Sequence, residues 1–213
     1  MRRYRRMHPL LDGALGLVAP VRCAGCDAPL DAADGLCRVC LLLVERCTGS
    51  GAVFIYGGPV ADAIQRYKYG GRSELGGSLA SMMRAKALQL SGEIDAVVPV
   101  PLHWRRRRAR GYDQAALLAR PIAKALRVPA LLRGLRRVRH TPSQVDLSFS
   151  ERRRNVEHAF APYRLQGTQR VLLIDDVRTT GATLESASRA LRAGGVRRIH
   201  TLVLAARLLD GAA

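Results

Sequence analysis

The chain has 213 residues and a mass of 23.2 kDa, and 48% of its residues are apolar, which is enough for one full hydrophobic core and a smaller module. It carries 35 Lys and Arg against 17 Asp and Glu, a formal net charge of +18. This excess predicts an anionic partner such as nucleic acid, a phosphorylated metabolite or a membrane surface. Periodic runs of Leu, Val and Ile exclude wholesale disorder. A membrane span is excluded because no uncharged apolar stretch approaches about 18 residues.

The first 20 residues combine a basic start with an apolar stretch, which imitates a secretory signal peptide. Asp12 interrupts the apolar part, and Arg22 precedes Cys23 where a lipoprotein signal needs a small residue. The favoured alternative is an amphipathic helix that ends at Pro20. Its apolar face would consist of Leu10, Leu11, Ala14, Leu15 and Val18. We therefore expect a cytoplasmic protein.

The five cysteines all lie between Cys23 and Cys47. Two Cys-x-x-Cys pairs fit a tetrahedral four-thiolate zinc site. The pairs are Cys23 with Cys26 and Cys37 with Cys40. The alternatives are disulfides, which a cytosolic location disfavours, or a decayed site. Such a knuckle has almost no core, so the metal would supply its folding energy. We expect residues 1–50 to form an N-terminal helix and a zinc module, with a core separate from that of the main domain, residues 51–213.

From Val53 onward, strand-like and helix-like segments alternate, which predicts an α/β sheet. The expected strands are 53–56, 94–100, 171–174 and 199–205. The expected helices are 60–69, 78–90, 114–126 and 184–193. Pro121 should kink or divide the third of these helices. The segment 133–160 has no sustained period and many charges, which predicts a long excursion with short helical pieces.

The most informative segment is Val-Leu-Leu-Ile-Asp-Asp-Val-Arg-Thr-Thr-Gly-Ala-Thr, residues 171–183. An apolar strand ends in two carboxylates, and a loop of small residues leads into the N-terminus of a helix, which is where open α/β sheets bind ligands. Hydroxyl groups, a glycine that permits close approach and the partial positive charge of the helix end suit a phosphate. Asp175 and Asp176 repel a phosphate, so their natural partners are vicinal sugar hydroxyls or a metal ion.

This segment resembles the phosphoribosyl-diphosphate (PRPP) signature of type I phosphoribosyltransferases. Further motifs follow a fixed order behind the paired cysteines: Tyr67-Lys-Tyr-Gly70, Val98-Pro-Val-Pro101, Arg110-Gly-Tyr-Asp-Gln114, Gln144 with Leu147-Ser148, and 152–160 with Asn155. In this order they resemble the ComF/GntX-like family over nearly the whole chain. The alternative is an unrelated α/β protein in which the two acids only cap a helix.

The resemblance implies an open parallel sheet flanked by helices and a site for PRPP with magnesium. It places the 5-phosphate on the signature loop, the ribose hydroxyls on the acid pair and the diphosphate on backbone amides of the Pro-Val-Pro segment. The implied PRPP-binding residues are Asp175, Asp176, Arg178, Thr179, Thr180, Gly181, Ala182, Thr183, Val100, Pro101 and Leu102.

The implied reaction displaces diphosphate from PRPP by a nucleophile, with magnesium and arginines stabilising the departing group. No catalytic residue is assigned, because Thr179 stands where purine-salvage relatives often carry an acid and cannot accept a proton near neutral pH. Tyr112 and Asp113 also depart from the usual Phe-Asn of their motif, which leaves its role in acceptor binding open.

The segment 103–154 contains 14 Arg and 1 Lys against 3 acidic residues. That excess suits a nucleic-acid backbone. The nucleic-acid candidates are Arg105, Arg106, Arg107, Arg108 and Arg110, which have the diphosphate as an equal alternative. Trp104 and Tyr112 either stack on unpaired bases or pack against the domain.

ComF-type proteins are associated with DNA uptake during natural transformation. The resemblance therefore favours a cytosolic PRPP-binding protein that acts on or beside incoming single-stranded DNA, with proteins of the uptake machinery as further partners. The alternatives are a non-catalytic adaptor that senses PRPP, and a metabolic transferase for a small base.

Overall fold

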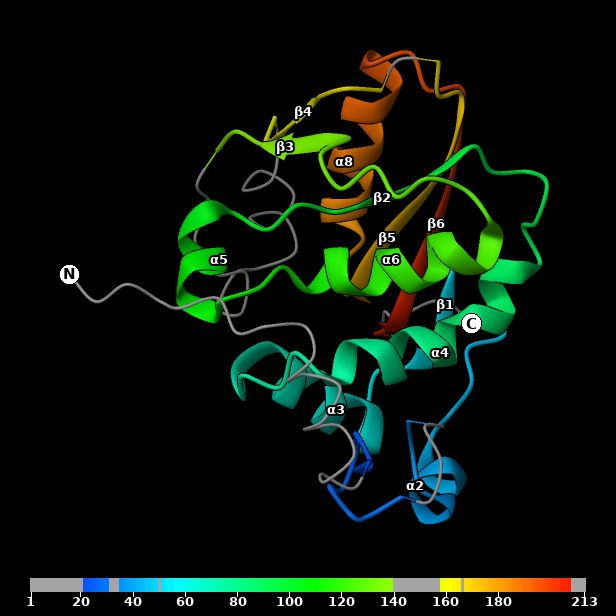
Figure 1. Ribbon diagram of the computed structural model, residues 1–213, viewed down its shortest axis with the longest axis vertical. Coiled ribbons are helices and arrows are strands. Elements are labelled where there is room, and N and C mark those ends of the chain that lie inside the picture. The colour runs from blue at the N-terminus through cyan, green and yellow to red at the C-terminus, as the bar shows by residue number, and fades with distance from the viewer. Residues whose placement is uncertain (1–20, 31–34, 50, 140–157, 166, 208–213) are drawn as a thin grey trace, which may run out of the picture.

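The computed structural model describes residues 21–30, 35–49, 51–139, 158–165 and 167–207 (Figure 1). The N-terminal helix expected before Pro20 and the motif residues from Gln144 to Asn155 lie outside these ranges. The elements are, in chain order, α2 (Arg38–Leu43), β1 (Ala52–Ile55), α3 (Gly58–Tyr69), α4 (Leu75–Leu88), β2 (Ala96–Pro99), α5 (Trp104–Arg110), α6 (Gln114–Leu126), β3 (Leu135–Arg137), β4 (Phe160–Pro162), β5 (Arg170–Arg178), α8 (Ala182–Ala193) and β6 (Arg198–Ala206).

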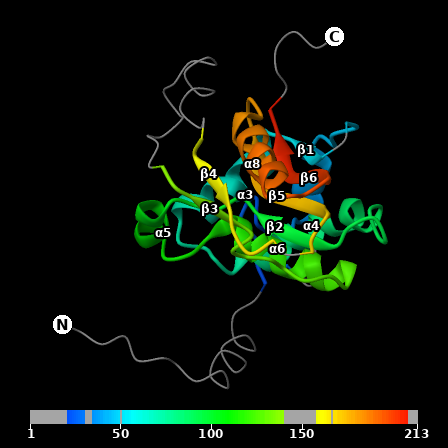
Figure 2. The ribbon, with the colours of Figure 1, turned by 90° about the horizontal axis from the view of Figure 1, so that it is seen from above.

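A parallel sheet in the order β1-β6-β5-β2 forms the centre of the molecule. Helices α4 and α6 cover one face and α8 the other (Figures 1 and 2). Alternate residues of β5 enter the two cores: Leu172 and Ile174 pack with α3, α4 and α6, whereas Val171 and Leu173 pack with α8. Burial of both faces explains the continuous apolar run of this strand. The predicted parallel α/β fold is confirmed.

Helix α6 runs from Gln114 to Leu126 with Pro121 inside it. Of the two outcomes predicted for Pro121, a kink or a division, the division is wrong. Pro121 lies on the exposed side of the helix, while Leu118, Ile122 and Leu126 continue the buried face through it. Proline removes one backbone hydrogen bond. The continuous apolar packing outweighs that loss.

The two described ends of the segment 133–160 pair as an antiparallel ribbon, β3 with β4, and are not helical. The rest of the segment, for which short helical pieces were predicted, lies outside the described residues. Arg137 lies opposite Phe160 and Leu135 opposite Pro162. A strand of three residues is too short to show a period in the sequence. On β3, Leu135 and Arg137 share one face and Arg136 points to the other.

The cysteine module shares its core with the sheet domain, contrary to the expected separate cores. Cys23, Leu36 and Cys40 belong to the same buried cluster as Val60 and Ile64 of α3. The module is too small to bury these side chains alone, so it uses α3 as its second layer. A hydrogen bond of 3.1 Å from Arg66 Nη1 to the Ala24 carbonyl fastens the two together.

Within the ranges that the structure describes, none of the helices combines the length and the apolar character needed to cross a membrane.

Candidate functional site

A cavity of about 310 Å³ opens at the carboxyl ends of β2 and β5, between α3, α5 and the start of α8. It brings together most of the residues that the PRPP resemblance singled out. Those that line it are Val100, Pro101, Leu102, Asp175, Asp176, Arg178, Thr179, Gly181 and Thr183. Thr180 and Ala182 belong to the same loop and contact each other, because Thr180 Oγ1 accepts a hydrogen bond of 3.4 Å from the Ala182 amide.

The β5–α8 loop, residues 179–181, has the form expected of a phosphate loop. Gly181 adopts φ +80° and ends the loop where α8 begins, a backbone conformation that favours glycine. The side chains of Thr179 and Thr183 line the cavity, and the N-terminal end of the twelve-residue α8 lies directly behind the loop. The loop therefore offers hydroxyl donors and the positive end of a helix dipole to an anion.

The acid pair lies at the end of β5 with a lysine as counter-ion. Lys68 Nζ lies 2.7 Å from Oδ1 of Asp176, and Asp176 is only 6% exposed. Burial lowers the pKa of Lys68, but Asp176 and then Asp175 act against it, and the net direction is upward. Asp175 accepts a 2.8 Å hydrogen bond from the amide of Asp176. Burial and the neighbouring Asp176 raise the pKa of Asp175 to about 7. Lys68 was missed as a site residue, although it stands inside the Tyr67-Lys-Tyr-Gly70 motif.

The β2–α5 loop also lines the cavity, but its amides are engaged within the protein. The Val100 amide donates to the Ile174 carbonyl (2.8 Å), and the Leu102 amide donates to Oδ2 of Asp113 (3.2 Å). Pro101 has no amide hydrogen. The prediction that backbone amides of Val100 and Leu102 bind a diphosphate is therefore not supported by the geometry.

The contacts of Asp113 account for an acid at the position where the usual motif has Asn. Its Oδ1 caps α6 by accepting from the Ala116 amide (3.2 Å), while Oδ2 holds Leu102. Burial raises the pKa of this carboxyl group. Asp113 thus ties the β2–α5 loop to α6, a role that its sequence context did not reveal.

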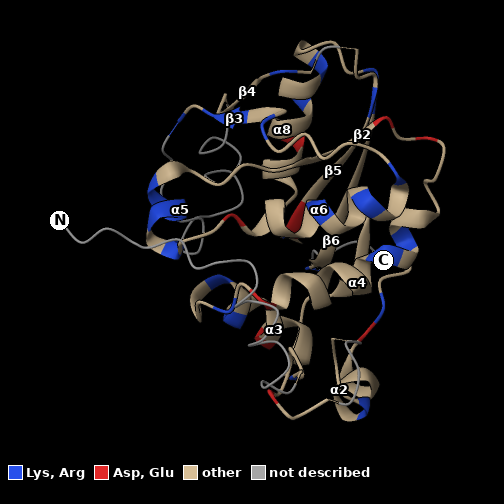
Figure 3. Cartoon of the chain, viewed as in Figure 1, with Lys and Arg blue, Asp and Glu red and all other residues tan. Residues whose placement is uncertain are grey.

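Helix α5 carries a run of arginines, drawn in blue in Figure 3, and they divide into two sets. Arg106 and Arg110, one helical turn apart, line the cavity. Arg105, Arg107 and Arg108 are exposed on the outer side. The sequence did not predict α5 as a helix, because a run of arginines has no apolar period.

The aromatic residues beside α5 also differ from each other. Trp104 is 61% exposed and lies beside the Arg105 guanidinium, 5.3 Å from the ring centroid, so its packing alternative is wrong. Tyr112 is half-buried, and its hydroxyl donates to the Tyr67 carbonyl. Of these two aromatic residues, only Trp104 is therefore exposed enough to stack on an unpaired base.

Two further cations in the cavity wall were not assigned to it from the sequence. Arg137 comes from β3, and Arg207 follows β6. Arg207 lies over the ring of Tyr56 at 5.1 Å. Burial lowers the pKa of Arg137 to about 10, and the nearby Arg106 acts in the same direction. Only the alternation of β3, which its short length hides, could have placed Arg137 at the site.

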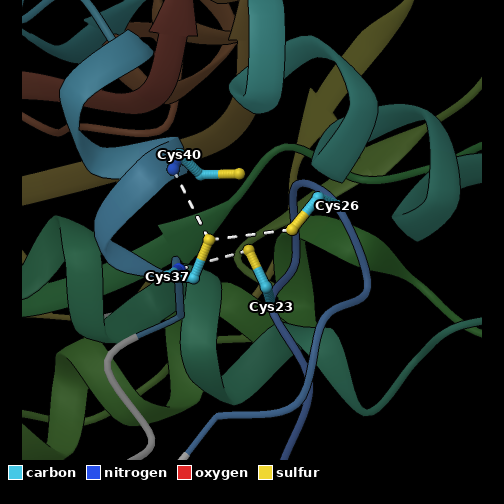
Figure 4. Close-up of side chains that lie close together, drawn as sticks. All are labelled: Cys23, Cys26, Cys37 and Cys40. Carbon is cyan, nitrogen blue, oxygen red and sulfur yellow. Dashed lines mark hydrogen bonds between the residues drawn. The ribbon is translucent and has the colours of Figure 1, made fainter.

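The four paired cysteines converge at the edge of α2 (Figure 4). The sulfur atoms of Cys23, Cys26, Cys37 and Cys40 all lie within 4.8 Å of one another, and none of them forms a disulfide. The Cys26 and Cys37 sulfurs are 3.7 Å apart. A tetrahedral zinc with bonds of about 2.3 Å needs sulfur atoms about 3.8 Å apart. These four residues could therefore hold a metal ion.

Backbone amides also point at these sulfurs. The Cys37 amide donates to Cys23 Sγ (3.2 Å), and the Cys40 amide donates to Cys37 Sγ (3.5 Å). Burial acts to raise the pKa of Cys23, but hydrogen bonds from the backbone of Cys26 and Cys37 outweigh it and lower the pKa to about 6. Such donors stabilise the thiolate form, which is the form that binds metals.

Comparison with known proteins agrees with this geometry. The phosphoribosyl transferase domain family matches residues 113–211, which include β5 and the β5–α8 loop. Competence protein F of Haemophilus influenzae is 34% identical over 199 residues, covering 86% of this chain and 83% of its own. The DNA utilization protein YhgH of Escherichia coli K12 is 29% identical over 191 residues, covering 85% and 82% of the two chains.

Competence protein ComFC of Bacillus subtilis is 27% identical over 176 residues, covering 79% of this chain and 70% of its own. Among solved structures, the glutamine PRPP amidotransferase of B. subtilis has 22% identity and a TM-score of 0.46, covering 65% of this chain and 30% of its own. That structural likeness is too weak to carry an argument, whereas the similarity to competence protein F extends over most of both chains. The chain carries a phosphoribosyltransferase domain and belongs to the ComF/GntX-like family of competence protein F.

Proposed function

We propose that this protein binds PRPP with magnesium in the cavity and acts as a ComF-type phosphoribosyltransferase-family protein in DNA uptake. One observation carries the proposal. A single cavity combines a hydroxyl-rich loop at a helix N-terminus, an acid pair and several arginines. These three features match the 5-phosphate, the ribose hydroxyls and the diphosphate of one ligand.

The residues of the cavity have distinct roles in this proposal. Thr179 and Thr183 donate hydrogen bonds to the 5-phosphate, and Asp175 and Asp176 accept them from the ribose hydroxyls. In the transfer, the bond between C1 of the ribose and the diphosphate oxygen breaks while an acceptor nucleophile bonds to C1. The electron pair leaves with the diphosphate, and the arginines stabilise its charge.

Magnesium fits this site by the chemistry of its donors. Carboxylate oxygens are hard ligands, and magnesium in proteins is held by one or two carboxylates together with substrate phosphates. Asp175 and Asp176 would hold the ion with the ligand, and the ion would neutralise charge on the diphosphate.

Two further assignments belong to the proposal. We infer a structural zinc on the four cysteines, in a module of residues 1–50 that precedes the transferase domain, residues 51–213. We also infer that the outer side of α5 binds single-stranded DNA, with Trp104 as a stacking platform and the exposed arginines on phosphates. The names of two relatives, competence protein F and DNA utilization protein, support DNA as a partner. We further infer a cytoplasmic location and contact with the uptake machinery.

The proposal is tested by stabilisation and turnover of the purified full chain. PRPP with magnesium should raise the melting temperature, because a ligand that binds only the folded state stabilises it. Release of diphosphate from PRPP should then be followed with and without single-stranded DNA. Stabilisation without release would identify a non-catalytic sensor, and release that depends on a small base would identify a metabolic transferase. A melting temperature that PRPP leaves unchanged would refute the proposal.

A further inference from the structure

A second cavity, of about 370 Å³, lies at the opposite end of the sheet from the cavity at the carboxyl ends of β2 and β5. It opens where β5 begins and α8 ends, next to β4, and we call it the ribbon cavity. The residues that line it are Pro162, Tyr163, Arg164, Leu165, Gly167, Thr168, Gln169, Gly194 and Gly195, none of which lines the first cavity. Sites for small ligands in proteins occupy about 300–1,000 Å³, so the ribbon cavity has room for a nucleotide base.

An aromatic ring in the wall of the ribbon cavity has two arginines beside it. The guanidinium carbon of Arg136 lies 5.0 Å from the ring centroid of Tyr163, and that of Arg164 lies 5.1 Å from it. Tyr163 is half-buried, whereas both arginines are exposed. The Tyr163 amide donates to the Gly134 carbonyl (3.0 Å), which fixes the ring to the start of β3. Contacts between a guanidinium group and an exposed ring are weak, so these arginines are able to turn to a phosphate.

The electrostatics of the ribbon cavity favour a neutral group inside it and negative charge beside it. The wall includes Gly194, the C-cap of α8, and the C-terminal end of a helix carries partial negative charge. Asp95 also touches this wall, by accepting from the Gln169 amide (3.1 Å), but it is paired with Arg170 at 2.6 Å. The neighbouring segments 133–139 and 158–165 contain five arginines and no acidic residue. A neutral, planar base with a phosphate on either side fits this pattern.

The β3–β4 ribbon connects this cavity with the outer side of α5. In both views the ribbon lies between α5 and α8 (Figures 1 and 2). Trp104 on α5 has the same combination of side chains, because the guanidinium carbon of Arg105 lies 5.3 Å from its ring centroid. Single-stranded nucleic acids are bound by aromatic side chains on which unpaired bases stack, along a positively charged surface that follows the backbone. The two aromatic positions and the arginine-rich ribbon between them form such a surface.

We propose that the ribbon cavity is a second contact site for single-stranded DNA, in which one base stacks on Tyr163 while Arg136 and Arg164 bind the phosphates beside it. That the strand is DNA rests on the proposed function, whereas the site itself requires only an unpaired strand. The site shares no residue with the PRPP cavity or with the outer side of α5. A strand that occupies both contact sites crosses the β3–β4 ribbon.

The experiment measures binding of the full chain to a labelled oligothymidylate and to an abasic strand of the same length, by fluorescence anisotropy. Tyr163→Leu removes the ring but stays apolar, and Tyr163→Phe is its matched control because it keeps the ring. Tyr163→Leu should weaken binding of the oligothymidylate by about fivefold or more. It should bind the abasic strand as the wild type does, because that strand has no bases to stack. Tyr163→Phe should bind both strands normally.

The arginines are tested by the salt dependence of the same binding. Replacing Arg136 and Arg164 together by Gln should reduce the slope of log affinity against log salt by about 1.4, at about 0.7 per lost phosphate contact. Arg84→Gln is the control, since Arg84 is an exposed residue of α4, on the other face of the sheet. It should leave the slope unchanged.

The outcomes separate the second site from the function on which it rests. Equal affinity of Tyr163→Leu and Tyr163→Phe for the oligothymidylate would overturn the second site, even if Trp104→Ala weakens binding as the proposed function requires. Binding that depends on Tyr163 but not on Trp104 or the outer arginines of α5 would uphold the second site and overturn the assignment of DNA to α5. If Tyr163→Leu weakens binding of the abasic strand as much as that of the oligothymidylate, the ring does not act by stacking, and the proposal is refuted.

Discussion

The β5–α8 and β2–α5 loops follow neighbouring parallel strands and face the same cavity, yet they present different chemistry to a ligand. The first offers hydroxyl groups and a helix N-terminus, with Gly181 at φ +80° shaping the turn. In the second, the Val100 and Leu102 amides are engaged by Ile174 and by Asp113, the N-cap of α6, and arginine side chains line the cavity beside them. Strand order thus determines where a ligand binds, while a single contact from another element decides whether backbone or side chains hold it.

The largest expected effect comes from disrupting the cysteine module, whose buried cluster includes residues of both strands that precede these loops. Cys23→Ser should abolish zinc binding and lower the free energy of unfolding by about 3 kcal/mol or more, since metal binding supplies folding energy to such modules. Cys23 and Cys40 belong to the same buried cluster as Val97 of β2 and Ile174 of β5, so the damage should reach both loops. Elemental analysis and chemical denaturation measure the two effects.

Cys47→Ser is the matched control, because Cys47 is not one of the four clustered cysteines. It should keep about one zinc per chain and change stability by less than about 1 kcal/mol. Full zinc occupancy in Cys23→Ser would contradict a four-cysteine site. Loss of zinc without any loss of stability would show instead that the shared core does not depend on the metal.

The second effect tests the β5 side of the comparison alone. Replacing both Asp175 and Asp176 by Asn should abolish the rise in melting temperature that PRPP causes, because the ribose hydroxyls lose their acceptors. At a ligand concentration 100 times the dissociation constant, that rise corresponds to about 2.7 kcal/mol. If PRPP raises the melting temperature of the double variant as much as that of the wild type, the assignment of the ribose hydroxyls to the acid pair is contradicted.

The two loops also differ in how far the sequence could predict them. The β5–α8 loop depends on contiguous residues, 171–183, so strand, acids, threonines and glycine were readable together. The β2–α5 loop depends on Asp113, on a helix without an apolar period and on the three-residue strand that carries Arg137. Those contacts form only when segments distant in the chain meet. The same limit hid the shared core of the cysteine module and the pairing of Lys68 with Asp176.

A third, smaller effect concerns pH and the acid pair. The pKa of Asp175 is raised to about 7, so the folded state binds its proton more tightly than the unfolded state does. The resulting stability is fully present below the unfolded pKa of about 4 and is lost as the pH rises through 7. Asp175→Asn should therefore stabilise the ligand-free protein at pH 8 by on the order of 1 kcal/mol. Unfolding in urea at pH 5 and pH 8 measures the difference.

Asp176→Asn provides the opposite sign in the same experiment. It removes the partner of Lys68, whose side chain is 21% exposed, and leaves a mostly buried ammonium without its counter-ion at 2.7 Å. Loss of one member of such a pair destabilises. If Asp175→Asn lowers stability at pH 8 as Asp176→Asn does, burial and charge repulsion do not raise the pKa of Asp175.

The smallest effect per residue is expected on the outer side of α5, where each exposed arginine contributes one screened contact. Replacing Arg105, Arg107 and Arg108 together by Gln should reduce the slope of log affinity against log salt for single-stranded DNA by about 2, at about 0.7 per lost phosphate contact. Replacing Arg106 and Arg110, which line the cavity, should leave this slope unchanged and weaken the binding of PRPP. Trp104→Ala should lower DNA affinity without changing the slope, because stacking releases no counterions. If the Arg106 and Arg110 variant loses the slope instead, the DNA backbone enters the cavity, and the separation of α5 into an inner and an outer side does not describe its function.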